Sequence, residues 1–252
     1  MTALFSKSEG ADSRPPVVLL HGFGGHHGVW ADVSAKLSPD IRTIAYDLPG
    51  HAGSLGLGEA VSPRRSASLI LDDLKQQDVA SFHLVGHSMG GAIATLIALS
   101  EPRRVLSLTL LAPGGYGESI DEAIMRRFAD AQSVEELADA LNPMCGAGHR
   151  PDPAELEALA LMRQLPGQRE VLIDLVGRIA RDGRQGVIPG DLLSTLTMPV
   201  RMIWGDNDQV LNPNQVKDLP AHFRVQRLAG KGHMLPEEVP DVVAQGICDA
   251  ID

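Results

Sequence analysis

A serine between glycines is the first feature of this sequence that could do chemistry. Residues 86–90 read GHSMG, directly after the strand-like run 82–85 and just before the helix-forming run 92–100. This is the G-x-S-x-G pattern of a nucleophile elbow, in which a strained turn between a strand and a helix holds a serine at the strand's end. The pattern predicts that Ser88 is a nucleophile, and that free N–H groups of the following helix point toward any negative oxygen formed beside it.

The glycines around this serine have a steric role. Gly86 and Gly90 lie two residues on either side of Ser88, where a Cβ would collide across so sharp a bend, and Gly91 lets the next helix lie close to the sheet. The same pentapeptide also occurs in ordinary strand-to-helix loops. The function therefore depends on whether a base and an acid stand at suitable places elsewhere in the chain.

A base and two candidate acids follow later strand-like runs. A serine hydroxyl needs a base to take its proton, and a histidine works best as that base when a carboxylate orients it. Residues 204–208 (WGDND) contain Asp206 and Asp208, and His233 stands in a glycine-bounded loop after the next run. The order Ser, Asp, His is one of the known chain orders of such a triad. Because strand ends of a parallel sheet meet at one edge, we expect these residues to lie near Ser88.

The elements that must position these residues alternate between strand and helix. The run 17–20 (VVLL) is too apolar for a strand with one wet face and predicts a strand buried on both sides. The alternation predicts a parallel sheet with helices on both faces. The expected strands are 17–20, 41–46, 82–86, 105–111, 200–204 and 225–228. The expected helices are 29–37, 62–77, 92–100 and 236–251.

The pattern changes between the fourth and fifth of these strands. Four helical runs follow one another there, separated by Gly, Pro and Asn, with no convincing strand between them. The runs are 119–131, 133–141, 153–165 and 169–181. The sequence therefore predicts one core domain, formed by residues 1–115 and 191–252, and a helical cap formed by residues 116–190.

Five motifs in order resemble the α/β-hydrolase superfamily, and specifically its capped branch of small esterases, lactonases and cofactor-free perhydrolases. Besides the elbow, the motifs are 20–25 (LHGFGG), 46–51 (YDLPGH), 204–208 (WGDND) and 232–233 (GH), so the match covers residues 15–252. The resemblance implies an α/β-hydrolase fold with a mostly parallel central sheet, helices on both faces and a helical cap insertion. It selects Asp208 over Asp206, because the family's acid stands four residues after the tryptophan. It also implies an oxyanion hole made by the backbone N–H groups of Phe23 and Met89, which agrees with what glycine loops and helix starts offer.

Other polar residues near these motifs are expected to have structural roles. Three of them lie in the loops after the first two strands, where the resemblance implies that they brace these loops: His21, Asp47 and His51. Two further histidines, His26 and His27, are expected to be exposed loop residues near the entrance. The cap arginines are expected to be solvated charges on helix faces: Arg126, Arg127 and Arg163.

The composition excludes several kinds of partner. A formal net charge of −10 over 252 residues disfavours nucleic acid and anionic membrane surfaces as partners. The two cysteines, Cys145 and Cys248, are far apart and have no metal-ligand spacing, so we expect neither a disulfide framework nor a metal site. The polar start, residues 1–14, lacks a signal-peptide core, and no 18-residue apolar run occurs. We expect a cytoplasmic protein without metal or organic cofactor; its oligomeric state is left open.

The function predicted from these residues is that of a serine hydrolase. It would cleave a carboxylic ester, lactone or thioester of a small or medium substrate through an acyl-enzyme on Ser88. A serine nucleophile disfavours dehalogenases and epoxide hydrolases, which use an aspartate, and Met234 stands where carbon–carbon bond hydrolases usually carry tryptophan. Two alternatives with the same site residues stay open: a small-molecule receptor or signalling protein with slow turnover, and a cofactor-free perhydrolase or haloperoxidase.

Overall fold

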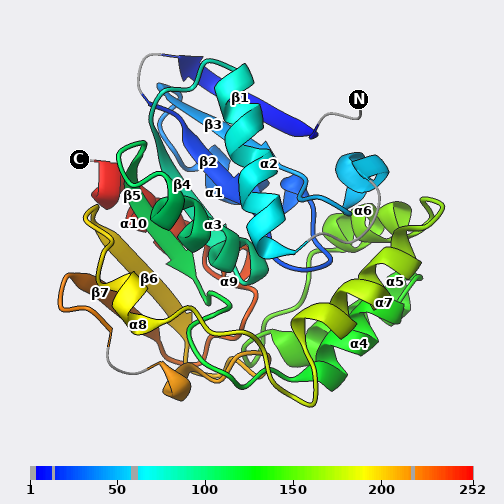
Figure 1. The fold of residues 1–252 in the computed structure, drawn as a ribbon. Helices are drawn as coiled ribbons and strands as arrows, with labels where there is room; N and C mark the ends of the chain where they lie inside the picture. Colours follow the sequence, from blue (N-terminus) through cyan, green and yellow to red (C-terminus); the bar gives the residue numbers. More distant parts are fainter. Residues whose placement is uncertain (1–3, 13–14, 58–61, 217–218, 252) are drawn as a thin grey trace.

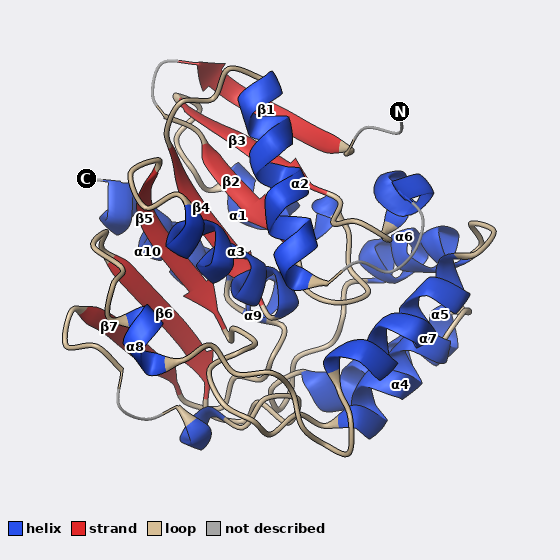
Figure 2. Ribbon diagram, viewed as in Figure 1, coloured by secondary structure: helices blue, strands red, loops and turns tan. Residues whose placement is uncertain are grey.

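A seven-stranded sheet forms the centre of the molecule (Figures 1 and 2). The computed structural model describes residues 4–12, 15–57, 62–216 and 219–251; the other residues of the predicted core domain lie outside the described residues. Within this part the strand order is β1-β3-β2-β4-β5-β6-β7. The strands are β1 (Ser6–Asp12), β2 (Val17–Leu20), β3 (Ile41–Tyr46), β4 (Phe82–His87), β5 (Val105–Leu111), β6 (Val200–Gly205) and β7 (Phe223–Leu228). Every neighbouring pair is parallel except β1 and β3, so the predicted mostly parallel sheet is confirmed.

The antiparallel edge strand β1 is the element that the sequence pattern did not indicate. Its residues, SKSEGAD, are mostly polar because a strand at the edge of a sheet faces solvent, and charged side chains there discourage pairing with other chains. Ser6 pairs with Tyr46, and the register shifts between Glu9 and Asp12. Gly10 lies in this irregularity with φ +88°, and a Cβ there would lie 2.3 Å from the carbonyl oxygen of Ile41. Hydrogen bonding to β3, rather than apolar content, determines this strand.

Helices cover both faces of the sheet. α2 (Pro63–Gln76) and α3 (Met89–Ser100) lie on one face, and α1 (Ala31–Ala35) and α10 (Pro240–Ile251) lie on the other (Figure 1). α3 begins three residues earlier than predicted, directly after Ser88. The predicted closing helix 236–251 is two helices, because α9 (Leu235–Glu238) ends before Pro240, and a proline disfavours helical backbone in the residue before it. A short α8 (Gly190–Leu193) precedes β6.

Four helices gather beside the carboxyl ends of the parallel strands, at the right of Figure 1. They are α4 (Glu122–Asp130), α5 (Val134–Leu141), α6 (Pro153–Arg163) and α7 (Gln168–Ile179). The first three begin where a side chain accepts a hydrogen bond from an N–H of the first turn, and these capping residues are Asp121, Ser133 and Asp152. The division of the chain into a core of 1–115 with 191–252 and a cap of 116–190 stays a prediction.

Two glycines test this description of the fold. We expect Gly10→Ala to lower the free energy of unfolding by about 1–3 kcal/mol, because its φ of +88° and the Ile41 carbonyl both oppose a side chain. Gly177→Ala, inside α7 with no atom within 4 Å of an added Cβ, should instead raise it by roughly 0.5–1 kcal/mol. Urea denaturation of both variants measures the two changes. A Gly10→Ala variant as stable as the parent would contradict the β1–β3 pairing.

Candidate active site

Ser88 lies at a strained turn between β4 and α3. Its φ is +52°, a left-handed value that side chains rarely adopt, and the residue is buried. A Cβ at Gly86 would lie 2.4 Å from the carbonyl oxygen of Gly90, and one at Gly90 would lie 2.2 Å from that of Leu20. At Gly91 an added Cβ would come within 2.7 Å of the Pro113 side chain. Glycines are therefore required around the turn, as expected from the sequence.

The structure brings the three predicted triad residues together in one chain of hydrogen bonds. His233 Nε2 lies 2.9 Å from Ser88 Oγ, and His233 Nδ1 lies 2.7 Å from Asp208 Oδ2. All three side chains are buried. When Nδ1 carries the ring proton and donates it to the carboxylate, Nε2 is left to accept the serine hydroxyl proton. This arrangement can activate a serine as a nucleophile.

The carboxylate of Asp208 is held by three further donors. Trp204 Nε1 donates to Oδ2 at 2.9 Å, and the N–H groups of Val210 and Leu211 donate to Oδ1 at 2.9 Å each. These hydrogen bonds fix the orientation of the carboxylate, so that Oδ2 faces the imidazole of His233. The other candidate, Asp206, is ion-paired with Arg227 at the surface. Of the two aspartates, Asp208 is therefore the one in contact with His233.

The loop that carries His233 is fixed by residues that sequence reasoning missed. The His233 N–H donates to the carbonyl oxygen of Met144 at 2.7 Å, and its own carbonyl accepts from Nε2 of His87 at 2.8 Å. Burial, together with the neighbouring His233, lowers the pKa of His87 to about 3, so this ring is neutral. Glu238 accepts the N–H groups of Gly232 and Gly146. Nothing in the sequence separates Glu238 from the glutamate beside it, so its role follows from the packing alone.

Phe23 and Met89 stand where the resemblance predicts oxyanion donors. Phe23 lies in the glycine-rich loop after β2, and Met89 is the first residue of α3. Neither N–H donates a hydrogen bond to another described residue; for Met89 this is usual, because the first N–H groups of a helix have no partner within it. Both line cavities that also contain Ser88. They stay the candidate oxyanion hole.

Two buried histidines join the loops after β2 and β3. His21 donates from Nδ1 to the carbonyl oxygen of Gly22 and accepts the N–H of Leu48 at Nε2. His51 accepts the N–H of Gly24 at 3.1 Å. Burial lowers the pKa of both rings, that of His51 to about 4, so both are neutral and structural in the way that was expected. Asp47 completes this network by accepting from His27.

Arg163 is not the solvated charge that was expected. It is buried, donates to the carbonyl oxygen of Gly24 at 3.2 Å, and its guanidinium lies 5.0 Å from the centre of the Phe128 ring. Burial lowers its pKa to about 10. The correction arises because α6 turns this position toward the glycine-rich loop. Arg126 and Arg127 are exposed, as expected, and each lies beside an acidic side chain, Glu122 and Asp139 respectively.

The two loop histidines are also less exposed than expected. The side chain of His26 is 12% exposed, its Nδ1 accepts the N–H of Gly28, and its Nε2 lies 3.1 Å from Glu155 Oε1. The side chain of His27 is 27% exposed and lies against Asp47. Both are partly covered because the short 3-10 helix His27–Trp30 packs under α9 and beside α6.

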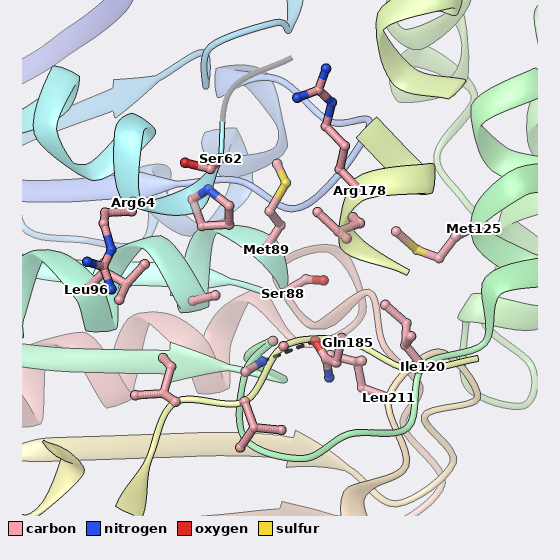
Figure 3. Close-up of a pocket in the computed structure, with 18 residues that line it drawn as sticks. Ser62, Arg64, Ser88, Met89, Leu96, Ile120, Met125, Arg178, Gln185 and Leu211 are labelled. Atoms are coloured by element: carbon pink, nitrogen blue, oxygen red, sulfur yellow. Dashed lines mark hydrogen bonds between the residues drawn. The ribbon is translucent and has the colours of Figure 1, made fainter. Parts of the chain in front are cut away.

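Two cavities of different size and character meet at Ser88. The larger has a volume of about 440 Å³ and mostly apolar walls, which include Leu96, Ile120 and Leu211 (Figure 3). In Figure 3 the guanidinium of Arg178 points away from Ser88. The second cavity is narrow, with about 20 Å³ of room, and is lined by Phe23, Met144, His233, Met234 and Glu237, together with Ser88. His233 therefore faces the narrow cavity and not the large one.

Glu237 lies among other acids. The carboxyl groups near it belong to Glu155, Glu238, Asp152 and Asp32. Burial and these neighbours raise the pKa of Glu237 from 4.5 to about 8. Its Oε2 is buried and has no hydrogen-bond partner among the described residues. This carboxyl group is therefore protonated at neutral pH.

Other kinds of site are not found in the described residues. No three His, Cys, Asp or Glu side chains are grouped there so that they could hold a metal ion. Cys145 is buried, which raises the pKa of its thiol to about 12, and it forms no disulfide. Across the same residues, no helix combines the length and the apolar character needed to cross a membrane.

A mostly parallel sheet with a serine elbow after a central strand, and a histidine and an acid after later strands, is the architecture of an α/β hydrolase. The chain belongs to the alpha/beta hydrolase family, whose model matches residues 17–246.

Similar proteins carry different names. The dihydrolipoyllysine-residue acetyltransferase component of an acetoin cleaving system from Pseudomonas putida is 34% identical over 94% of this chain and 63% of its own. The chain spans about 60% of the length of such components. Monoacylglycerol lipase ABHD6 from Mus musculus is 26% identical over 94% of this chain and 75% of its own. A solved meta-cleavage product hydrolase from Pseudomonas fluorescens superimposes with a TM-score of 0.83 at 19% identity, covering 98% of this chain and 93% of its own.

The two candidate acids provide a matched test of the site, because Asp208 contacts His233 and Asp206 contacts Arg227. We expect Asp208→Asn to slow labelling of Ser88 by a fluorophosphonate roughly a thousandfold, because the amide no longer holds the proton on His233 Nδ1. Asp206→Asn should change the rate less than about twofold, since its partner is a surface arginine. Intact-mass spectrometry measures both rates. Equal loss in the two variants would contradict the assignment of the acid.

The raised pKa of Glu237 predicts a pH-dependent stability. Between about pH 4.5 and 8 the folded chain keeps a proton on Glu237, whereas the unfolded chain releases it. The free energy of unfolding therefore falls as the pH rises through that range. Glu237→Gln removes this fall, so the difference in free energy of unfolding between this variant and the parent should shift in favour of the variant by roughly 3–4 kcal/mol from pH 5 to pH 8. Denaturation at both pH values measures the gain. The exposed Glu157→Gln serves as control, and the same pH-dependent gain there would refute the prediction.

Proposed function

We propose that this chain is a serine hydrolase that cleaves a carboxylic ester, lactone or thioester through an acyl-enzyme on Ser88. The observation that carries the proposal is the buried chain of hydrogen bonds from Ser88 through His233 to Asp208, at the meeting point of two cavities. The names of the similar acetyltransferase and lipase both describe acyl-group chemistry, which agrees with it.

In the first half of the reaction His233 Nε2 takes the hydroxyl proton of Ser88 as Oγ attacks the substrate carbonyl. The negative oxygen that forms is stabilised by the N–H groups of Phe23 and Met89. His233 then protonates the leaving alcohol or thiol, and the acyl group stays on Ser88. In the second half water attacks the acyl carbon with His233 again as base, and the acid is released. Asp208 stays ionised throughout and orients the imidazole, and no cofactor takes part.

The position of His233 suggests which part of the substrate enters which cavity. The leaving oxygen must face His233 to be protonated, and His233 lines the narrow cavity. The leaving alcohol or thiol therefore lies on the narrow side and is small. The acyl group extends into the apolar cavity of about 440 Å³, a volume typical of small-molecule sites. The proposed substrate is an apolar acyl group of medium length on a small alcohol or thiol.

Two series of esters test this proposal. For methyl esters of straight-chain acids, kcat/KM should rise about fourfold per added methylene until the large cavity is full, because each buried methylene contributes about 0.8 kcal/mol. For acetate esters of straight-chain alcohols, it should change little or fall as the alcohol lengthens. Initial rates by pH indicator measure both, with Ser88→Ala as control.

The outcome also separates the alternatives. Turnover that survives Ser88→Ala overturns the proposal. A folded parent that does not turn over any ester, but whose melting temperature rises with the same compounds, indicates the receptor alternative. Peracid formed from an ester and peroxide indicates the perhydrolase alternative. Cytoplasmic location, like these alternatives, stays a prediction.

A further inference from the structure

One carboxyl group in the narrow cavity has no role in the mechanism above. Glu237 shares that cavity with Ser88, His233 and Phe23. It follows His233 by four residues, in the short helix α9. Its Oε2 is buried and makes no hydrogen bond to any described protein group. Buried polar atoms nearly always have a hydrogen-bond partner, and none of the described protein groups supplies one to this oxygen.

The surroundings of Glu237 determine what that partner is. The neighbouring Glu238 already accepts two backbone N–H groups, and Glu155 lies against His26. No group of three ligating side chains for a metal ion occurs in the described residues. With acids around it, the Glu237 carboxyl keeps its proton at neutral pH, so it offers one donor and one acceptor. A small neutral molecule that can both donate and accept fits this group.

When no leaving alcohol or thiol occupies it, the narrow cavity has room for about one water molecule. A water needs at least about 10–15 Å³ of such room, and the cavity has about 20 Å³. A buried water also needs two to four polar partners. Glu237 supplies one, and Ser88 and His233, which line the same cavity, supply others.

We propose, on the basis of the proposed function, that Glu237 holds the water that hydrolyses the acyl-enzyme on Ser88. The water oxygen bonds to the acyl carbon while one of its O–H bonds breaks and the proton passes to His233 Nε2. The carbonyl electron pair moves to the oxygen and returns as the bond from carbon to Ser88 Oγ breaks. Oγ then takes the proton from His233, so the products are the free acid and the original serine. Glu237 keeps its own proton and acts only by hydrogen bonding.

The role in the second half-reaction distinguishes Glu237 from a merely structural residue. In Glu237→Leu, deacylation should fall at least about tenfold while acylation changes less than about threefold, because water takes part in deacylation alone. Acyl-enzyme then accumulates in the steady state. Glu237→Gln should recover most of the lost deacylation rate, since an amide also donates and accepts. Glu157→Leu, an exposed glutamate on α6, is the matched control and should leave both rates unchanged.

Rapid quench followed by intact-mass spectrometry measures both rates, with the methyl ester that the parent uses best. If the parent forms no acyl-enzyme, the proposed function itself fails. If the parent turns over and Glu237→Leu deacylates at the parent's rate, or loses acylation and deacylation equally, this inference alone is overturned. A high-resolution crystal structure of the parent gives an answer even where Glu237→Leu does not fold. An ordered water bonded to Glu237 and within reach of His233 Nε2 supports the proposal, and its absence there overturns it.

Discussion

The turn at Ser88 is the constraint on which the rest of the site depends. A left-handed φ at a residue with a side chain costs about 1–3 kcal/mol, and it persists because the surrounding packing leaves no alternative. Gly86 and Gly90 allow backbone from β2 and α3 to approach within a distance that no Cβ would tolerate. Since the carbonyl of Ser88 also accepts from Gly91 and Gly114, the strained residue is held from both sides. The hydroxyl is thereby presented to His233 instead of packing against the sheet.

Three histidines buried around this serine carry no charge. His21, His51 and His87 all have pKa values lowered by burial, so the imidazole that changes protonation in the proposed reaction is His233. Arg163 donates a hydrogen bond to the carbonyl oxygen of Gly24 in the loop after β2, and its guanidinium lies over the Phe128 ring of α4. Burial strengthens the interaction between His233 and Asp208, because water is largely excluded from around the pair.

The two cavities make the two sides of Ser88 different in size and polarity. One side of Ser88 is apolar and large enough for a chain of several carbons, whereas the other is narrow and carries His233 and Glu237. In the proposed reaction, proton transfer takes place on the narrow side and the acyl group binds on the apolar side. This asymmetry relates the proposed acyl specificity to the proposed position of the water, since both follow from where His233 lies.

The sequence by itself determined the elements and the order of the site residues. Buried apolar runs, glycine turns and capping side chains act through neighbours in the chain, so β2, β3 and β5 lie where they were expected, and the serine, the acid and the histidine follow strand ends. The tertiary structure decided what depends on distant segments. It buried Arg163 and gave Glu238 two N–H groups, from residues 92 and six positions away in the chain. The edge strand β1 and the two cavities were also decided by the tertiary structure, because they form only when separate parts of the chain meet.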